Sequence, residues 1–293
     1  MQADLPGGET IEVFTYHAAR HGPDDPIVVV LPGAGRNGDD YRDSWIKAAE
    51  RYDLLVLSPA FVDAQFPGPI SYNLGGMIAQ GADPATLEDI QVTAPKTWIH
   101  ADIEAIFDKA VQLSGSSATH YDLFGHSAGA QIIHRMILFA PELRVRTALA
   151  ANAGWYTTAE ADVAFPYGTK GISLPPGQLE KAFARRLVVF LGELDNADET
   201  RGSLRATPET NAQGLHRLAR GCYFYAAAMQ EQARLKLSTN WQLKIVPGVG
   251  HDYRRMADAA AEFLYGAPGP AASQMTCSQV LSSPPSRGSA TAN

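Results

Sequence analysis

The residues Gly125-His126-Ser127-Ala128-Gly129 match the pattern G-x-S-x-G. A serine in this pattern can attack a carbonyl carbon when a neighbouring base accepts its proton. The pattern is short and arises by chance in roughly one chain in ten of this length, so its context decides its meaning. The segment 121–124 before it has the composition of a strand, and the segment 128–139 after it has the pattern of a helix. This strand–turn–helix context predicts that Ser127 is a nucleophile.

A sharp turn at Ser127 would hold the serine in a strained backbone conformation, and the flanking glycines would leave room for neighbouring elements. The serine oxygen would then project above the sheet at the N-terminus of a helix. The helix dipole at that end favours developing negative charge. We therefore expect the turn itself to support acyl chemistry.

A second glycine-rich segment, residues 33–38, fits the dinucleotide pattern G-x-G-x-x-G. That pattern needs an acidic residue about 20 positions later, at the end of the next strand, but this strand ends Leu57-Ser58-Pro59. Asp39 and Asp40 would also repel a pyrophosphate at the helix N-terminus. We therefore expect no dinucleotide, no other cofactor and no metal.

With its serine motif, the chain resembles the α/β-hydrolase family. In that family an acid follows a later strand, and a histidine comes after the acid. Here Asp195 follows the strand-like segment 187–191, and His251 follows the segment 243–246. The resemblance implies that His251 takes the proton of Ser127 and that Asp195 orients the imidazole.

Two other carboxylates compete with Asp195 for the orienting role, namely Asp198 and, less strongly, Glu193. Either could instead cap the helix that follows. His126 is expected to shape the turn rather than to act as the base. The oxyanion hole needs two backbone N–H groups. The resemblance assigns one to Ala128 and the other to a glycine-rich loop, where Ala34 and Gly35 both remain candidates because Pro32 replaces the histidine often found in the family.

Short apolar segments alternate with helical patterns, which predicts an α/β fold with a mainly parallel sheet and helices on both faces; by resemblance this is the α/β-hydrolase fold with covering insertions. The expected strands are 10–16, 27–31, 54–57, 121–124, 147–151, 187–191 and 243–246, and the expected helices are 41–51, 98–113, 128–139, 211–234 and 253–265. One catalytic domain would span residues 1–265. Its insertions, at about 59–96 and 155–181, fit neither period and are expected to cover the site.

From Gly266 the chain becomes rich in Pro, Ser and Ala, which predicts a flexible tail over 266–293. The two cysteines, Cys222 and Cys277, have no metal-site spacing, and both are expected to be free thiols.

The composition bounds the function further. The net charge of −7 argues against a nucleic-acid partner, and no apolar stretch approaches the roughly 18 residues of a membrane span. The first residues lack the pattern of a signal peptide; the compartment stays open between cytoplasmic and, if a leader was trimmed, periplasmic or secreted. The oligomeric state, a homodimer included, also stays open.

The segment Leu31-Pro32-Gly33-Ala34-Gly35-Arg36-Asn37-Gly38, with Tyr41-Arg42-Asp43-Ser44-Trp45 after it, resembles the polymer-degrading branch of the family over roughly residues 10–265. That branch includes poly(aspartic acid) hydrolases, polyhydroxybutyrate depolymerases and feruloyl-esterase-like proteins. An oligomeric acid would need cations near the site. Five arginines stand close to the motifs in sequence, with Arg36 the foremost: Arg36, Arg201, Arg205, Arg254 and Arg255. Trp155 and Tyr156 are expected to line the pocket, and Tyr72, Asn73 and Trp98 are weaker candidates.

The leading hypothesis is a serine hydrolase that cleaves amide or ester bonds of an oligomeric or polymeric acid through an acyl-enzyme, with poly(aspartic acid) as the favoured substrate. The alternatives are a polyhydroxybutyrate depolymerase or feruloyl-type carboxylesterase, which predicts an apolar cleft, and a non-catalytic binding module on the same fold. Acyl transfer to an acceptor other than water would use the same residues.

Overall fold

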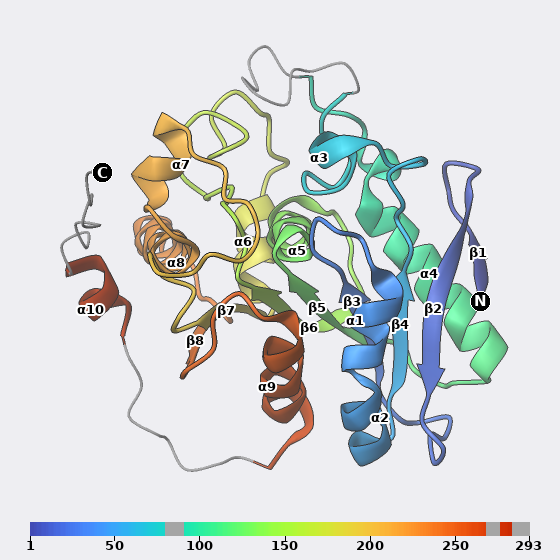
Figure 1. The fold of residues 1–293 in the computed structure, drawn as a ribbon. Helices are drawn as coiled ribbons and strands as arrows, with labels where there is room; N and C mark the ends of the chain where they lie inside the picture. The colour runs from blue at the N-terminus through green and yellow to red at the C-terminus, as the bar shows by residue number, and fades with distance from the viewer. Residues whose placement is uncertain (80–90, 268–275, 283–293) are drawn as a thin grey trace.

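A computed structural model of the chain describes residues 1–79, 91–267 and 276–282. Its centre is an eight-stranded sheet with the strand order β1-β2-β4-β3-β5-β6-β7-β8 (Figure 1). The strands are β1 Gln2–Asp4, β2 Thr10–His17, β3 Ile27–Leu31, β4 Leu55–Pro59, β5 Tyr121–His126, β6 Val145–Ala151, β7 Leu187–Gly192 and β8 Gln242–Val246. β2 pairs antiparallel with β1 and β4, and all other pairs are parallel. All seven predicted strands are present, and the short β1 was missed.

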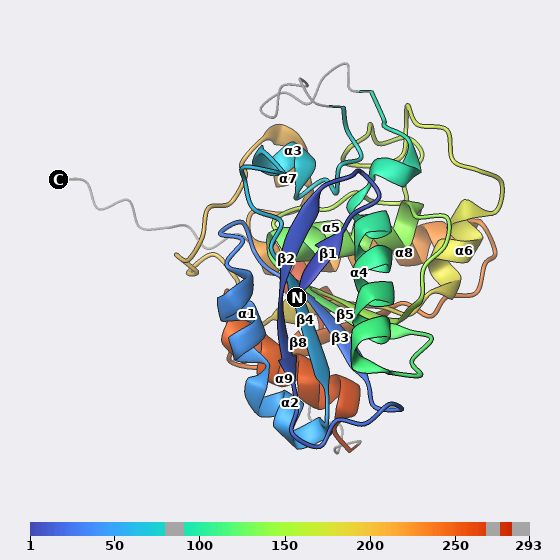
Figure 2. The same ribbon diagram turned by 90° about the vertical axis from the view of Figure 1, so that its right-hand side faces the viewer.

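Helices cover both faces of the sheet, and a 3-10 turn, η1, precedes the longest early helix. The helical elements are α1 Gly38–Ser44, α2 Ile46–Tyr52, α3 Gly68–Ser71, η1 Pro95–Thr97, α4 Ile99–Ser114, α5 Ala128–Phe139, α6 Gln178–Ala184, α7 Pro208–Gln213, α8 Arg217–Arg234, α9 Tyr253–Tyr265 and α10 Cys277–Ser282. In Figure 2, α1, α2 and α9 lie on one face, whereas α4, α5 and α8 lie on the other.

Each face of the sheet has its own apolar core, as the alternation of side chains along a strand requires. In β3, Val28 and Val30 pack into the core beneath α2 and α9, whereas Ile27, Val29 and Leu31 pack into the core beneath α4 and α5. Every residue of β3 is therefore buried, and its sequence is continuously apolar, as expected for a strand covered on both faces.

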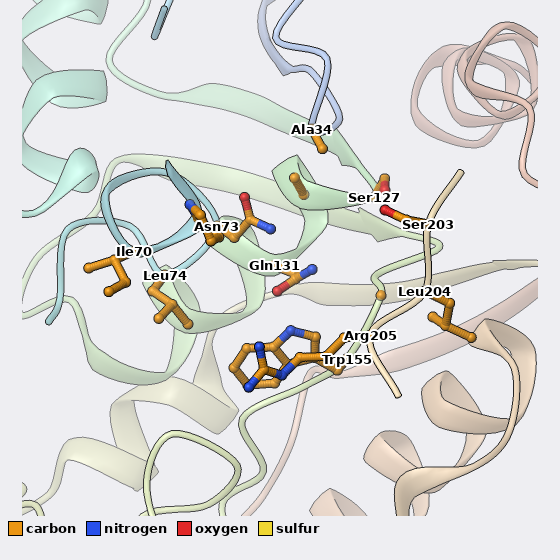
Figure 3. A pocket seen from close by; sticks show the side chains of 13 residues that line it. Ala34, Ile70, Asn73, Leu74, Ser127, Gln131, Trp155, Ser203, Leu204 and Arg205 are labelled. Carbon is orange, nitrogen blue, oxygen red and sulfur yellow. The ribbon is translucent and has the colours of Figure 1, made fainter. Parts of the chain in front are cut away.

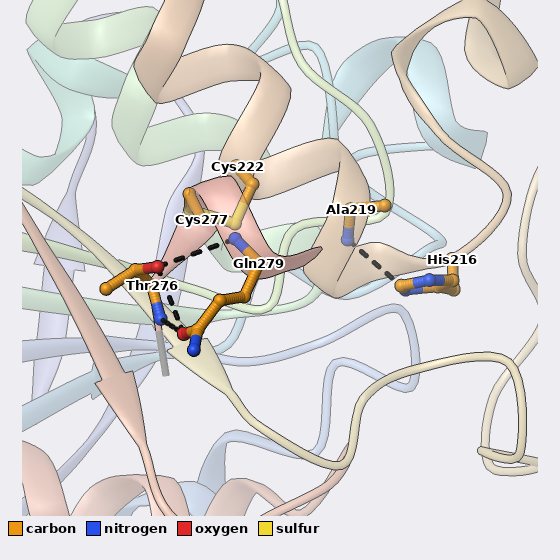
Figure 4. Close-up of a disulfide and its surroundings, with 6 residues drawn as sticks. All are labelled: His216, Ala219, Cys222, Thr276, Cys277 and Gln279. Atoms are coloured by element: carbon orange, nitrogen blue, oxygen red, sulfur yellow. Dashed lines mark hydrogen bonds between the residues drawn. A yellow bond between two sulfur atoms is a disulfide. The ribbon is translucent and has the colours of Figure 1, made fainter. Parts of the chain in front are cut away.

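Two predicted helices are each divided in the structure. The predicted helix 41–51 corresponds to α1 and α2, which meet at Trp45. The predicted helix 211–234 corresponds to α7 and α8, with a break at Gly214. Gly214 has φ of 141°, a backbone conformation that residues with a side chain rarely adopt. His216 then caps α8, because its Nδ1 accepts a hydrogen bond from the backbone N–H of Ala219 at 3.2 Å (Figure 4).

The prediction of free thiols is wrong. Cys222 on α8 and Cys277 on α10 form a disulfide with a Cα–Cα distance of 5.2 Å (Figure 4). Residues 276–282 therefore include a helix docked on α8. The 55 positions that separate the two cysteines give no sign in sequence that the chain returns to α8.

The described parts of the expected insertions lie at the edge of the sheet at which the parallel strands end (Figure 1). Residues 80–90 of the first insertion lie outside the described residues, and the end of the second insertion forms the start of α6. α5 is buried along its whole length, because it lies between the sheet and this cover. Among the described helices, none combines the length and the apolar composition that a membrane span requires.

Candidate functional site

Ser127 lies in a sharp turn between β5 and α5. Its φ of 57° and ψ of −110° are a strained conformation for a residue with a side chain. The turn is possible because its neighbours are glycines. A Cβ atom on Gly129 would lie 2.2 Å from the carbonyl oxygen of Leu31, and one on Gly125 would lie 2.5 Å from the carbonyl carbon of Gly129. The half-buried Ser127 is thereby held at the N-terminus of α5.

Asp195 and His251 follow the neighbouring parallel strands β7 and β8. The Nδ1 atom of His251 lies 2.8 Å from Oδ2 of Asp195, and both side chains are buried. Nη1 of Arg217 donates to the other carboxylate oxygen, Oδ1, at 3.4 Å. Both oxygens of Asp195 thus accept from a side chain, which fixes the carboxylate plane and with it the imidazole.

The two rival carboxylates are placed differently. Asp198 is exposed, and its backbone N–H donates to the Asn196 side chain at 3.0 Å. Oε2 of Glu193 accepts from the backbone N–H of Gly248 at 2.7 Å, so it supports the turn ahead of His251. Of the three candidate acids, Asp195 is the one that meets the imidazole.

The imidazole of His251 lies beside the Ser127 turn. The ring centroids of His251 and His126 are 4.5 Å apart, and His126 directly precedes Ser127. His126 is fully buried, which lowers its pKa well below the ordinary value. Electrostatic repulsion from nearby His251 lowers this pKa further. Its Nδ1 lies 3.0 Å from the hydroxyl of Tyr41. A neutral, enclosed imidazole fits the expected role of shaping the turn.

Glu199 holds the backbone at His251, a contact that sequence reasoning missed. One of its oxygens, Oε2, accepts a hydrogen bond from the backbone N–H of His251. Arg201 pairs with the same carboxylate at 2.7 Å, and this pairing is the main reason that the pKa of Glu199 falls to about 2. The carboxylate therefore stays ionised at neutral pH and continues to accept the hydrogen bond from the backbone N–H of His251. No sequence pattern marks this residue.

The glycine-rich loop after β3 approaches the serine closely. A Cβ atom on Gly33 would lie 3.4 Å from Cβ of Ser127. Ala34 and Ala128 both line the pocket next to Ser127, whereas Gly35 is not among the lining residues. The N–H of Ala128 belongs to the first turn of α5, where backbone N–H groups have no intrahelical acceptor. Of the two candidates in the loop after β3, Ala34 is the one on the pocket wall.

A pocket of about 290 Å³ opens at Ser127 (Figure 3). Its walls come from the loop after β3, the two insertions, α5 and the segment before α7. They are Ala34, Pro69, Ile70, Asn73, Leu74, Ser127, Ala128, Gln131, Gly154, Trp155, Ser203, Leu204 and Arg205. The lining combines apolar side chains with amides, hydroxyls and one guanidinium, so it suits an acyl chain that carries polar groups.

Of the expected substrate-binding residues, Trp155 lines the pocket and Arg36 does not. The guanidinium of Arg36 donates to the carbonyl oxygens of Phe61 (3.1 Å), Phe66 and Gly68 (2.8 Å), and it stacks on Tyr72. Its donors are thus used to hold the first insertion. This geometry argues against the expected contact of Arg36 with substrate.

Tyr156 and Arg254 also lie away from the pocket lining. Tyr156 is buried and stacks on Phe224 with ring centroids 4.5 Å apart, so it belongs to the core. Arg254 is exposed on α9, where it covers the Tyr253 ring and pairs with Asp40 at 3.6 Å. Tyr156 is next to Trp155 in sequence, and Arg254 follows His251 by three positions, but neither side chain lines the pocket.

The pocket contains residues that the sequence analysis did not single out, among them Gln131, Ser203 and Leu204. Gln131 could have been found, because residues four positions apart share one face of a helix, and it follows Ser127 by four. Its amide points into the pocket in Figure 3. Ser203 and Leu204 lie in an irregular segment with no such signal. The described residues contain no group of three side chains suited to hold a metal ion.

Comparisons with known proteins fit this arrangement. No family model and no curated protein sequence matches the chain. Among solved structures, a poly(aspartic acid) hydrolase-1 from Sphingomonas sp. KT-1 is 34% identical with a TM-score of 0.78, over 88% of this chain and 94% of that one. A poly(3-hydroxybutyrate) depolymerase from Bordetella parapertussis is 33% identical with a TM-score of 0.79, over 90% and 86% of the two chains.

A more distant structure, a siderophore hydrolase from Aspergillus nidulans, shares the fold with a TM-score of 0.52 and 13% identity, over 94% of this chain and 96% of that one. The predicted fold class is thereby confirmed. An identity of 33–34% over most of both chains shows that the first two structures are homologues of this protein. The chain therefore belongs to the α/β-hydrolase family of serine hydrolases, together with these two polymer-degrading enzymes.

Proposed function

We propose that Ser127, His251 and Asp195 form a catalytic triad that hydrolyses amide or ester bonds of an oligomeric or polymeric acid, with poly(aspartic acid) as the favoured substrate. The observation that carries the proposal is the 2.8 Å contact between His251 Nδ1 and Asp195 Oδ2, beside a serine in a strained turn.

In this mechanism His251 accepts the proton of the Ser127 hydroxyl as its oxygen bonds to the substrate carbonyl carbon. Asp195 stabilises the imidazolium that forms. The N–H groups of Ala128 and Ala34 stabilise the oxyanion. The imidazolium then gives its proton to the leaving amine or alcohol, and the acyl-enzyme remains. In the second half, His251 accepts a proton from water as the water oxygen attacks the acyl carbon, and it returns that proton to the Ser127 oxygen as the acid leaves.

A neutral polyester is the second candidate, because Ile70, Leu74 and Leu204 give the pocket an apolar part. Rates on poly(aspartate) and on a hydroxybutyrate oligomer separate the two candidates. We expect faster cleavage of poly(aspartate) than of the hydroxybutyrate oligomer, and no cleavage of either by Ser127→Ala. Faster cleavage of the neutral oligomer would overturn the polyanion assignment but leave the triad standing.

A further inference from the structure

Arg135 is a buried cation without a carboxylate partner in the described part of the chain. It lies on α5, two turns after Ser127, and only 1% of its surface is exposed. Its Nε donates to Thr157 Oγ1 at 2.9 Å, and its Nη1 donates to the carbonyl oxygens of Gln131 (2.9 Å) and Asn73 (3.0 Å). The buried Nη2 atom has no partner.

A buried guanidinium bound only to neutral oxygens is costly, because dipoles replace lost hydration only in part. Burial lowers the pKa of Arg135 to about 9, so the group still carries its charge at neutral pH. The side chain thus contributes an uncompensated positive charge to the interior. An anion near it would lower the free energy of the folded protein.

This charge lies directly behind the wall of the pocket. The two carbonyls that Nη1 binds belong to Asn73 and Gln131, which both line the pocket, and the guanidinium carbon is 4.3 Å from the centre of the Trp155 ring. Trp155 therefore separates Arg135 from the pocket by a single layer.

Two further buried arginines bind the other side of the wall. Arg220, which is fully buried, donates to the carbonyl of Gly154 at 2.7 Å, and Arg217 donates to the carbonyl of Ser203 at 2.9 Å. Arg217 pairs with Asp195, whereas Arg220 forms no ion pair with a described carboxylate. Arg220 therefore adds a second buried positive charge next to the pocket wall, at Gly154.

We propose that Arg135 is a specificity-determining residue: its buried charge, acting across Trp155, makes the pocket select acyl groups that carry a carboxylate. The inference rests on the proposed serine-hydrolase function and assigns its preference for acids to a charge in the interior rather than to surface arginines. In a poorly solvated setting a charge acts over several ångströms with little screening by salt.

The first experiment uses the unaltered protein and two matched substrates, the mono-p-nitrophenyl ester of succinic acid and the p-nitrophenyl ester of butanoic acid. We expect about tenfold or greater preference in kcat/KM for the charged ester, corresponding to about 1.4 kcal/mol. The preference should persist from about 0.02 M to about 0.5 M NaCl, where the Debye length falls to a few ångströms. No preference, or one abolished by salt, would overturn the role of a buried charge.

The second experiment compares Arg135→Gln with Arg135→Lys. In Arg135→Gln, loss of the charge should raise KM for the succinate ester relative to the butanoate ester, so that the ratio of the two kcat/KM values falls to about one. Arg135→Lys keeps the charge and should retain most of the preference for the succinate ester. The exposed Arg51, paired with Glu262, provides the control: Arg51→Gln removes the same charge and should leave the ratio unchanged. An unaltered ratio in folded Arg135→Gln would contradict the proposal.

The two failures are distinguishable. If the unaltered protein hydrolyses neither ester, the serine-hydrolase proposal itself is at fault. If it hydrolyses both esters at similar rates, the hydrolase stands and the assignment to Arg135 falls. Should Arg135→Gln fail to fold, Arg135→Lys against the unaltered protein still tests the site, and the salt experiment tests whether a buried rather than an exposed charge sets the preference.

Discussion

The Nδ1 atom of His251 and the Oδ2 atom of Asp195 are 2.8 Å apart, although 56 positions separate the residues in sequence. The contact follows from the order of the sheet. β7 and β8 are neighbouring parallel strands, so the loops that follow them leave the same edge. Both oxygens of Asp195 are occupied, one by His251 and the other by Arg217. The imidazole is thereby held in one orientation beside the Ser127 turn.

Replacement of Asp195 tests this pairing. Asp195→Asn preserves the shape but favours the wrong tautomer of His251, so we expect kcat to fall by about 10⁴. Asp198→Asn changes an exposed carboxylate nearby and should leave kcat within about twofold. The measurement is kcat on an activated ester. Equal losses in the two variants would contradict the assignment of the acid.

The Ser127 turn depends on glycine at position 129. Gly129→Ala would place a Cβ atom 2.2 Å from the Leu31 carbonyl oxygen, which forces β3 and α5 apart. We expect a loss of about 1–3 kcal/mol in the free energy of unfolding, measured by urea denaturation, together with loss of activity. Gly22→Ala is the control, since its nearest contact would be an ordinary 3.5 Å to Asp25. Similar stabilities of the two variants would show that the turn tolerates a side chain.

The fold was predictable where a signal is local. The continuous apolar segment Ile27–Leu31 indicates a strand covered on both faces, and helix α5 begins at Ala128 as its pattern predicts. The order serine, acid, histidine placed Ser127, Asp195 and His251 at strand ends. Their proximity in the structure follows from parallel strands and not from any feature of the residues between them.

Other features depend on contacts that sequence does not display. Arg36 stands next to the oxyanion loop in the chain, yet it turns away to bind carbonyls of the first insertion. No motif marks Arg135, and an arginine in a helical pattern is ordinarily exposed. The Cys222–Cys277 disulfide depends on where the tail docks.

Asp102 on α4 provides a test of pH dependence away from the site. Burial raises its pKa to about 7, and the negative charge of Glu9 adds to this. The folded state therefore binds its proton more tightly than the unfolded state, and this contribution to stability is complete below about pH 4 and lost as the pH rises through 7.

The variant Asp102→Asn should thus raise Tm by several degrees at about pH 8.5 and change it little at about pH 4. Thermal unfolding at the two pH values measures the effect. Asp108→Asn, on the same helix but mostly exposed, serves as the matched control. A pH-independent change for Asp102→Asn would show that burial does not shift its titration.

The disulfide between α8 and α10 should stabilise the folded chain. Closing a loop across 55 positions restricts the unfolded chain and contributes on the order of 2–4 kcal/mol. We expect dithiothreitol to lower Tm of the unaltered protein and to have no effect on Cys222→Ser, whose Tm should already be lower. Equal Tm values with and without reductant would indicate that the tail contributes nothing to stability.

Covalent labelling tests whether Ser127 is an activated nucleophile. The protein is treated with a fluorophosphonate probe, digested, and the modified peptide is identified by mass spectrometry. We expect one modified residue, Ser127, and no modification of the Ser127→Ala variant. Modification of another serine, or equal labelling of the Ala variant, would contradict this assignment.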